Sequence, residues 1–378
     1  MDTRYPSVED LRELARKKIP KFAFEYLDGG CNDDINIKKN TDRIRNIELK
    51  PEYLIDYKYP NLKTELFGHI YDTPFGISPI GLQGLVWPKS PEILAKAAFE
   101  NNIPFILSTV TTSTIETIAE ITEGRAWFQL YHPAEKSVTI DIIKRVENAG
   151  CPVLVILADV PTFGYRTRDI RNGLSMPPKM TIKNVFEVIK RPQWLMQTII
   201  NGQPNFEILK PYMPKNLNLT QLAKFMDATF SGRLDEDKIK KIRDLWKGKL
   251  VLKGIESVQD VEKAYKIGFD GIIVSNHGGR QVDVGQATID SLKLIVPHYK
   301  NKIKIMMDSG IRSGADVARV MSCGAEFCFM GRTFMYGVSA LGKKGGNHTI
   351  TMLKKQLTQV MEQFSCGKVS EFQEKLIK

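Results

Sequence analysis

One short segment of the sequence, Val274-Ser-Asn-His-Gly-Gly-Arg-Gln281, combines residue types that could carry out chemistry. Two glycines separate His277 from Arg280, so both side chains can enter one pocket while the backbone comes close to a ligand. Histidine exchanges protons near neutral pH, and arginine binds anions. A lone histidine is usually structural, but the position of His277 after an apolar run and beside Arg280 favours a functional role.

The elements that must hold such a site follow from about residue 74 onward, where short β-rich runs alternate with helical stretches. This alternation is typical of βα units and a parallel sheet. Several runs are apolar throughout, as strands buried on both faces must be. A doubly wound sheet would normally carry a GxGxxG turn after its first strand, and the sequence has none. Eight runs predict a (β/α)8 TIM barrel: 75–78, 104–108, 126–131, 152–159, 249–253, 270–275, 304–308 and 326–330.

Polar residues stand at the C-terminal end of these runs. In a (β/α)8 barrel those ends converge on one face, where the active site is built. Polar residues that merely capped loops would be scattered without strand register, so the pattern predicts a site at that face. The strand-end residues are Ser78 with Pro79, Ser108, Gln129 with Tyr131, Asp159, Lys253, Ser275 to His277, Asp308, and Gly331 with Arg332.

The N-terminal stretch 1–70 is predicted to form a helical cap on the barrel. A helical pattern runs from Val8 to Ala15 after a possible Ser7 cap, and the segment KFAFEYLDGG follows Pro20 and ends in two glycines. We expect this cap and the barrel to form a single domain over 1–378.

Almost ninety residues separate the fourth run, which ends at Asp159, from the fifth, which starts at Lys249. Ordinary connections have about 2–6 residues, so an insertion is expected after strand 4. Its part at 178–220 has six Lys or Arg against two Glu and also contains Phe186, Trp194 and Ile199. Such a mixture suits a segment that binds a membrane surface. A lid helix packed on its own barrel explains the pattern equally well.

Composition limits the remaining possibilities. The net charge of +11 favours anionic partners, but no nucleic-acid-binding motif accompanies it, so no nucleic-acid partner is expected. Five cysteines without paired spacing argue against disulfides and a zinc site, and we expect no metal. Because neither a signal peptide nor a stretch of eighteen apolar residues is present, we expect a cytoplasmic protein. Binding through 178–220 would place it peripherally on the inner face of the cell membrane.

The segment SNHGGRQ resembles the signature of the FMN-dependent α-hydroxy-acid oxidising enzymes, and the resemblance runs nearly end to end. The segments ISPIGLQGLVWPK (77–89), WFQLY (127–131), GYRTRD (164–169) and DLWKGKLVLKG (244–254) are most similar to the membrane-associated mandelate and lactate dehydrogenases. The resemblance implies a barrel that binds FMN, oxidises an (S)-2-hydroxy acid to the 2-oxo acid and assembles as a homotetramer.

Carried over by position, His277 matches the active-site base of that family, and Asp159 matches the carboxylate that orients it. Arg280 and Arg166 match the pair that binds the substrate carboxylate. Two phenols match groups that hydrogen-bond the substrate, those of Tyr26 and Tyr131.

The resemblance also implies an FMN site. Lys253 matches the lysine at the pyrimidine edge of the flavin, where a positive charge stabilises the reduced ring. Leu157 stands where the family commonly has a hydroxyl group, so one hydrogen bond to the flavin is expected to be missing. The other expected flavin-binding residues are Pro79, Ile80, Gly81, Ser108, Gln129 and Ser275. The expected phosphate-binding residues are Asp308, Ser309, Gly310, Arg312, Gly331 and Arg332.

The basic and apolar insertion favours a membrane electron acceptor such as quinone, and hence a dehydrogenase. A soluble hydroxy-acid oxidase that produces hydrogen peroxide would share the same catalytic residues. A flavin-binding protein that has lost turnover is the third interpretation.

Overall fold

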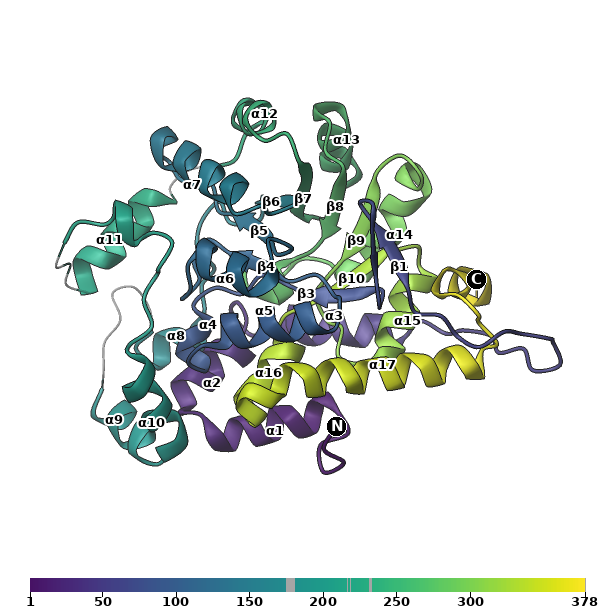
Figure 1. Ribbon diagram of the computed structural model, residues 1–378, viewed down its shortest axis with the longest axis horizontal. Helices are drawn as coiled ribbons and strands as arrows, with labels where there is room; N and C mark the ends of the chain where they lie inside the picture. The colour runs from purple at the N-terminus through teal and green to yellow at the C-terminus, as the bar shows by residue number, and fades with distance from the viewer. Residues whose placement is uncertain (175–180, 216, 218, 231–232, 378) are drawn as a thin grey trace.

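The computed structural model describes residues 1–174, 181–215, 217, 219–230 and 233–377. Within these residues eight parallel strands form one sheet in the order β3-β10-β9-β8-β7-β6-β5-β4, and a bridge between Ile77 and Phe105 joins its two edges (Figure 1). The predicted (β/α)8 barrel is therefore confirmed. Its strands are β3 (Phe75–Ile77), β4 (Ile106–Ser108), β5 (Trp127–Leu130), β6 (Val153–Leu157), β7 (Lys249–Ile255), β8 (Gly271–Val274), β9 (Lys304–Met307) and β10 (Phe327–Met330).

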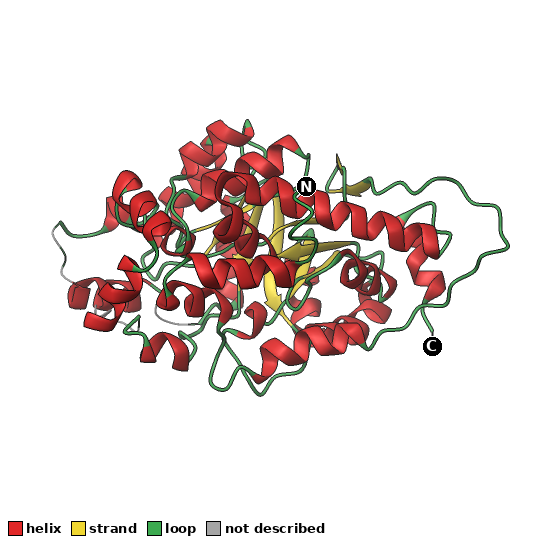
Figure 2. Cartoon of the chain, turned by 90° about the horizontal axis from the view of Figure 1, so that it is seen from below, coloured by secondary structure: helices red, strands yellow, loops and turns green. Residues whose placement is uncertain are grey.

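The apolar strands fill two layers of core because successive side chains of a strand point to opposite faces. In β6, Val153 and Val155 belong to the cluster inside the barrel, whereas Leu154 and Ile156 pack in the larger cluster outside it. The helices around the barrel (Figure 2) are α4 (Gln83–Val86), α5 (Ser90–Glu100), α6 (Ile115–Thr122), α7 (Lys136–Asn148), α12 (Glu236–Leu245), α13 (Val258–Ile267), α14 (Thr288–Tyr299), α15 (Gly314–Ser322), α16 (Arg332–Leu341) and α17 (Gly345–Gln363).

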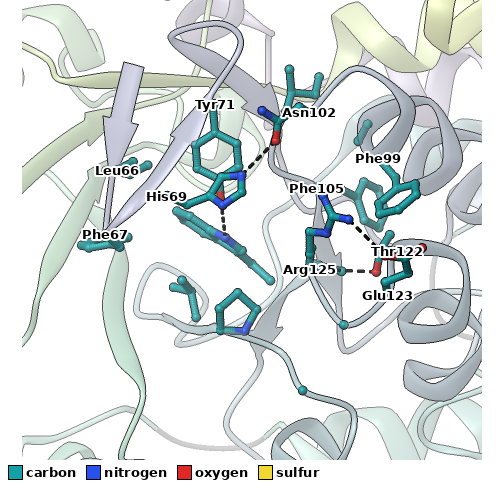
Figure 3. A pocket seen from close by; sticks show the side chains of 18 of the residues that line it. Leu66, Phe67, His69, Tyr71, Phe99, Asn102, Phe105, Thr122, Glu123 and Arg125 are labelled. Atoms are coloured by element: carbon teal, nitrogen blue, oxygen red, sulfur yellow. Dashed lines mark hydrogen bonds and ion pairs between the residues drawn. The ribbon is translucent and has the colours of Figure 1, made fainter. Parts of the chain in front are cut away.

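A hairpin of β1 (Thr64–Leu66) and β2 (His69–Tyr71) closes the N-terminal end of the barrel. Leu66 and Tyr71 join the inner cluster, and the Trp127 indole donates a hydrogen bond of 3.2 Å to the Tyr71 hydroxyl. A small pocket of about 280 Å³ lies beside the hairpin, where His69 bonds Asn102 (Figure 3). The sequence analysis anticipated no strands here.

The cap contains three helices, α1 (Val8–Lys18), α2 (Lys21–Asp28) and α3 (Ile35–Arg45). Ser7 caps α1 by accepting a hydrogen bond from the Asp10 amide, and α1 packs against α16. The glycines after α2 allow the cap to touch the His277 turn. A Cβ at Gly30 would lie 2.6 Å from the Gly279 carbonyl oxygen, so only glycine fits this approach.

The insertion after β6 contains α8 (Thr167–Arg171), α9 (Ile182–Ile189), α10 (Pro192–Asn201), η1 (Lys210–Tyr212) and α11 (Leu219–Thr229). Of the expected segment 178–220, residues 178–180, 216 and 218 lie outside the described residues. Trp194 attaches α10 to both the cap and the barrel. Its ring packs edge-on against Phe22 of α2, and its indole N–H donates to the Val86 carbonyl of α4 at 3.0 Å. No helix in the described ranges combines the length and apolar character needed to cross a membrane.

Candidate functional site

A cavity of about 650 Å³ opens at the C-terminal ends of the barrel strands. It gathers residues from the cap, the strand ends and the insertion. Most of the expected site residues line it, namely Tyr26, Pro79, Ile80, Gly81, Gln129, Tyr131, Arg166, Lys253, His277, Arg280, Asp308, Ser309, Gly310, Arg312, Gly331 and Arg332.

Three expected residues lie behind the cavity wall. Ser275 accepts hydrogen bonds from Lys253 Nζ at 2.8 Å and from the His277 amide at 3.1 Å, so it supports two residues of the wall. Ser108 is fully buried, and its hydroxyl accepts from the Val110 amide at 3.4 Å. Asp159 lies behind His277.

His277 and Asp159 form a hydrogen-bonded pair, with 3.0 Å between Nδ1 and Oδ1. His277 has a φ of +59°, and the two glycines that follow it also have positive φ, so the turn needs their conformational freedom. Because Nδ1 faces Asp159, Nε2 is the nitrogen available to the cavity.

Burial lowers the pKa of His277, and the charge and hydrogen bond of Asp159 offset only part of this effect. Burial by itself would raise the pKa of Asp159, but His277 and Lys253 outweigh it and hold that pKa below its usual value. The imidazole is therefore neutral at neutral pH. Beside an ionised Asp159 it can accept a proton, and the carboxylate then stabilises the imidazolium.

Arg280 and Arg166 form a cationic wall opposite Asp169, with their guanidinium nitrogens 3.8 and 4.0 Å from one carboxylate oxygen. Arg280 Nη1 donates to the carbonyls of Tyr26 and Gly29, whereas its buried Nη2 has no hydrogen-bond acceptor among the described residues. Burial and the charge of Arg280 lower the pKa of Arg166 to about 10. Two adjacent cations against one carboxylate leave an excess positive charge, so the wall can bind a carboxylate.

The two expected phenols face this wall. The Tyr26 ring lies 4.9 Å from the Arg280 guanidinium carbon, and its hydroxyl donates to the Gly81 carbonyl at 3.3 Å. Tyr131 is buried with its ring against Phe230, and burial raises its pKa. Tyr131 is therefore a neutral donor at physiological pH.

The residues expected at the flavin ring offer suitable donors. Gln129 Nε2 is buried and has no acceptor in the part of the chain that the structure describes, so it can donate to a ring carbonyl or nitrogen. Lys253 Nζ bonds Ser275 and lies 3.2 Å from Asp308 Oδ2, which holds its charge at the cavity floor. This donor set fits the polar edge of an isoalloxazine. Leu157 has no polar atom to offer the flavin, because its side chain is a hydrocarbon. It packs in an apolar cluster with Phe206 from the insertion.

The two expected phosphate loops follow β9 and β10. Ser309 and Gly310 have φ of +77° and +85°, and a Cβ at Gly310 would lie 2.7 Å from the Asn40 backbone. Arg312 lines the cavity, and among the described residues its side chain donates locally, from Nη1 to the Ile311 carbonyl. Arg332 donates instead to the carbonyls of Leu27, Gly29 and Gly278. In this structure Arg332 therefore joins the cap to the barrel.

The sequence analysis missed an apolar part of the cavity wall. α11 of the insertion contributes to it, as do α4 and the turn before α4. These residues follow no strand end, so no strand register could reveal them. The additional apolar wall residues include Leu82, Leu85, Phe206, Leu222 and Met226. Asp169 was also missed as a site residue, although it belongs to the GYRTRD segment.

The comparisons with known proteins agree with this geometry. The family model described as FMN-dependent dehydrogenase matches residues 15–378. The chain is 33% identical to (S)-mandelate dehydrogenase of Pseudomonas putida, over 96% of this chain and 91% of that protein. It is 35% identical to L-lactate dehydrogenase of Vibrio parahaemolyticus, over 93% of each.

Two solved structures are also similar to this chain over nearly its whole length. A crystal structure of the monotopic membrane protein (S)-mandelate dehydrogenase superposes with a TM-score of 0.93 at 32% identity, covering 99% of this chain and 100% of that one. A mandelate oxidase structure has a TM-score of 0.83 at 28% identity, covering 99% and 98%. With a family match over nearly the whole chain and a cavity whose residues fit the flavin, this chain belongs to the FMN-dependent dehydrogenase family.

Proposed function

We propose that this protein oxidises an (S)-2-hydroxy acid to the corresponding 2-oxo acid. The observation that carries the proposal is that His277, paired with Asp159, lines the same cavity as the half-buried cations of Arg280 and Arg166. A 2-hydroxy acid has a carboxylate for the cations and, on the adjacent carbon, the hydroxyl group that is oxidised. Its oxidation to the 2-oxo acid releases a proton that a base must take up.

In this proposal each part of the wall has one task. Arg280 and Arg166 bind the carboxylate, Tyr26 and Tyr131 hydrogen-bond the substrate, and His277 Nε2 takes a proton. Bound FMN supplies the chemistry of accepting two electrons. The apolar wall formed with the insertion suits the side chain of a lactate- or mandelate-like acid.

An anaerobic visible spectrum of the FMN-loaded protein tests this function. (S)-Lactate, (S)-mandelate and glycolate are added in turn, and bleaching of the flavin by one of them supports the reaction and reports the substrate size. Bleaching by none of them contradicts the proposal. Admitting air then separates the two enzymatic interpretations, because rapid peroxide formation indicates an oxidase and slow reoxidation a dehydrogenase.

We propose further that the electrons pass to a quinone-like acceptor at the inner face of the cell membrane. The supporting feature is the face formed by α9 and α10, whose large apolar side chains remain exposed next to exposed Lys183 and Lys190. An interfacial helix pair needs this combination, because apolar groups enter the acyl boundary while cations meet anionic headgroups. The exposed apolar residues are Ile182, Val185, Phe186, Ile189, Met196, Ile199 and Ile200.

Sedimentation with anionic phospholipid vesicles tests this face. The unmodified chain is expected to bind, and the double substitution Ile199→Ser with Ile200→Ser is expected to weaken partitioning at least about tenfold, because two apolar side chains no longer enter the bilayer. The matched control replaces exposed isoleucine and leucine elsewhere, Ile70→Ser with Leu294→Ser. If both variants lose vesicle binding equally, or if the unmodified chain does not bind vesicles, membrane docking through this face is contradicted.

A homotetramer is the assembly we propose. An arm between α3 and β1 exposes Tyr53, Leu54 and Tyr59, and large apolar side chains grouped in this way are typical of protein interfaces. The arm extends from the body at the end opposite α9 and α10 (Figure 1), so both faces can be used together. Light scattering of the FMN-loaded full chain tests the assembly, and a monomer mass contradicts it.

A further inference from the structure

Glu256 is a half-buried carboxylate near the active site to which the reaction above assigns no task. It directly follows β7, and Oε1 accepts a weak hydrogen bond of 3.5 Å from the Ser291 hydroxyl on α14. No lysine, arginine or histidine of the described ranges forms an ion pair with it within 4.0 Å. A carboxylate this buried normally has a cationic partner, so its presence needs another explanation.

The neighbour that does act on Glu256 is Asp159. Gly254, two residues earlier, packs so tightly on Asp159 that a Cβ there would lie 2.5 Å from Asp159 Cγ. Asp159 uses Oδ1 to bond His277, whereas its buried Oδ2 has no hydrogen-bond donor among the described residues. Burial and the charge of Asp159 together raise the pKa of Glu256 to about 7.

A chain of polar contacts also connects Glu256 with the His277 turn. Ser291 accepts a hydrogen bond of 2.7 Å from Gln286 Nε2, and the Gln286 carbonyl accepts one of 3.3 Å from Asn276 Nδ2. Asn276 precedes His277 and bonds the Gly279 amide across the turn. Glu256 is thus linked to His277 in two ways. Its charge interacts with that of Asp159, which bonds His277, and a series of hydrogen bonds leads from Ser291 to Asn276 beside His277.

We propose that Glu256 is a positioning residue that acts on His277 through Asp159, setting how much negative charge surrounds the base when it takes up its proton. The inference rests on the role proposed for His277. A second carboxylate behind the pair stabilises the imidazolium, so it makes proton uptake from the substrate more favourable. Without it, Asp159 is the carboxylate that acts directly on the imidazolium.

The other charges around the pair explain why a second carboxylate is useful. Lys253 at the end of β7 and Arg166 before α8 both disfavour the imidazolium and lower the pKa of His277, in addition to the larger effect of burial. Asp260, the first acid of α13, already accepts from Ser257 and pairs with Lys263. Asp308 and Asp169 pair with Lys253 and Arg166. Glu256 is a further acid that interacts with Asp159 and forms no ion pair among the described residues, so its charge can add to theirs.

The test is the pH dependence of flavin reduction in the FMN-loaded full chain with and without Glu256→Gln. At pH 6 the Glu256 carboxyl is mostly protonated, so E256Q and the unmodified chain are expected to reduce at equal rates. At pH 8.5 the carboxyl is ionised in the unmodified chain, and E256Q is expected to be about two- to tenfold slower, since it lacks the charge that stabilises the imidazolium. The matched control is Glu262→Gln, an exposed acid of α13 paired with Lys266, which should leave the profile unchanged.

A second readout does not depend on turnover. In the FMN-loaded protein with ¹³C-labelled histidine rings, the His277 resonance, assigned by its loss in His277→Asn, is expected to shift in a step near pH 7. E256Q should remove that step. An equal slowing of E256Q at both pH values, or persistence of the step, overturns the proposal and indicates a packing role. If no 2-hydroxy acid reduces the flavin, the function proposed above fails, and the NMR step still decides the role of Glu256.

Discussion

Replacing His277 by alanine is expected to leave FMN bound and to lower the rate of its reduction by the substrate about 10²- to 10⁴-fold, the usual contribution of a positioned base. The reason is that no other neutral base takes the place of Nε2. Asp159 lies behind His277 and does not line the cavity, so its carboxyl does not stand where Nε2 meets the substrate. Anaerobic stopped-flow absorbance at the flavin band measures the rate.

The control for this experiment is His298→Ala, which removes an exposed imidazole on α14 far from the cavity. It is expected to reduce as fast as the unmodified chain. If His277→Ala keeps its yellow colour and reduces at the original rate, His277 is not the base. If it is isolated without FMN, the turn that contains His277 has a structural task as well, and added FMN must restore the spectrum before the rate is compared.

The second large loss of activity is expected from Arg280→Lys. A lysine keeps the charge but loses the fork of nitrogens, so the substrate carboxylate loses a charge-assisted hydrogen bond worth about 1.5–3 kcal/mol. The ratio kcat/KM should fall about 10- to 150-fold, with binding and turnover both affected, because the carboxylate is no longer held in line with His277. Steady-state kinetics with an artificial electron acceptor gives both constants.

Arg280 also supports the cap, since Nη1 donates to the Tyr26 and Gly29 carbonyls. Its replacement could therefore act by loosening the cap. Arg12→Lys is the matched control, because Arg12 binds Asp28 of the cap through two nitrogens and does not line the cavity. If Arg12→Lys reproduces the kinetic loss, the cap accounts for it. Unchanged kinetics in Arg280→Lys would place the carboxylate elsewhere.

Much of the barrel could be predicted from the sequence because buried parallel strands must be apolar on both faces. The runs that end at Asp159 and at Lys253 correspond to β6 and β7. Asp159 follows β6, and Lys253 lies in the C-terminal half of β7. The hairpin β1–β2 was not predicted. Its six strand residues bury only Leu66 and Tyr71, so their local pattern carries little signal until the inner core is assembled.

The site residues also divide into those whose place could be predicted from the sequence and those whose place could not. A family resemblance is read from residue identity and spacing, so it named His277, Asp159 and Arg280 without any knowledge of distance. It also named Ser108 and Ser275, which lie behind the wall, and Arg332, whose guanidinium is occupied by cap carbonyls. Neighbours along the chain do not reveal which atom of a side chain remains free.

The sequence by itself therefore determined the repeated βα pattern, the polar strand ends and the residues capable of proton transfer and anion binding. Those properties are local, because they depend on residue type and on spacing along one strand or one turn. Only the tertiary structure decided that Nδ1 of His277 faces Asp159 and that Nη2 of Arg280 has no acceptor among the described residues. The contact of Gly254, two residues before Glu256, with Asp159 was decided in the same way. Residues far apart in the sequence make these arrangements, and their geometry exists only after the barrel has closed.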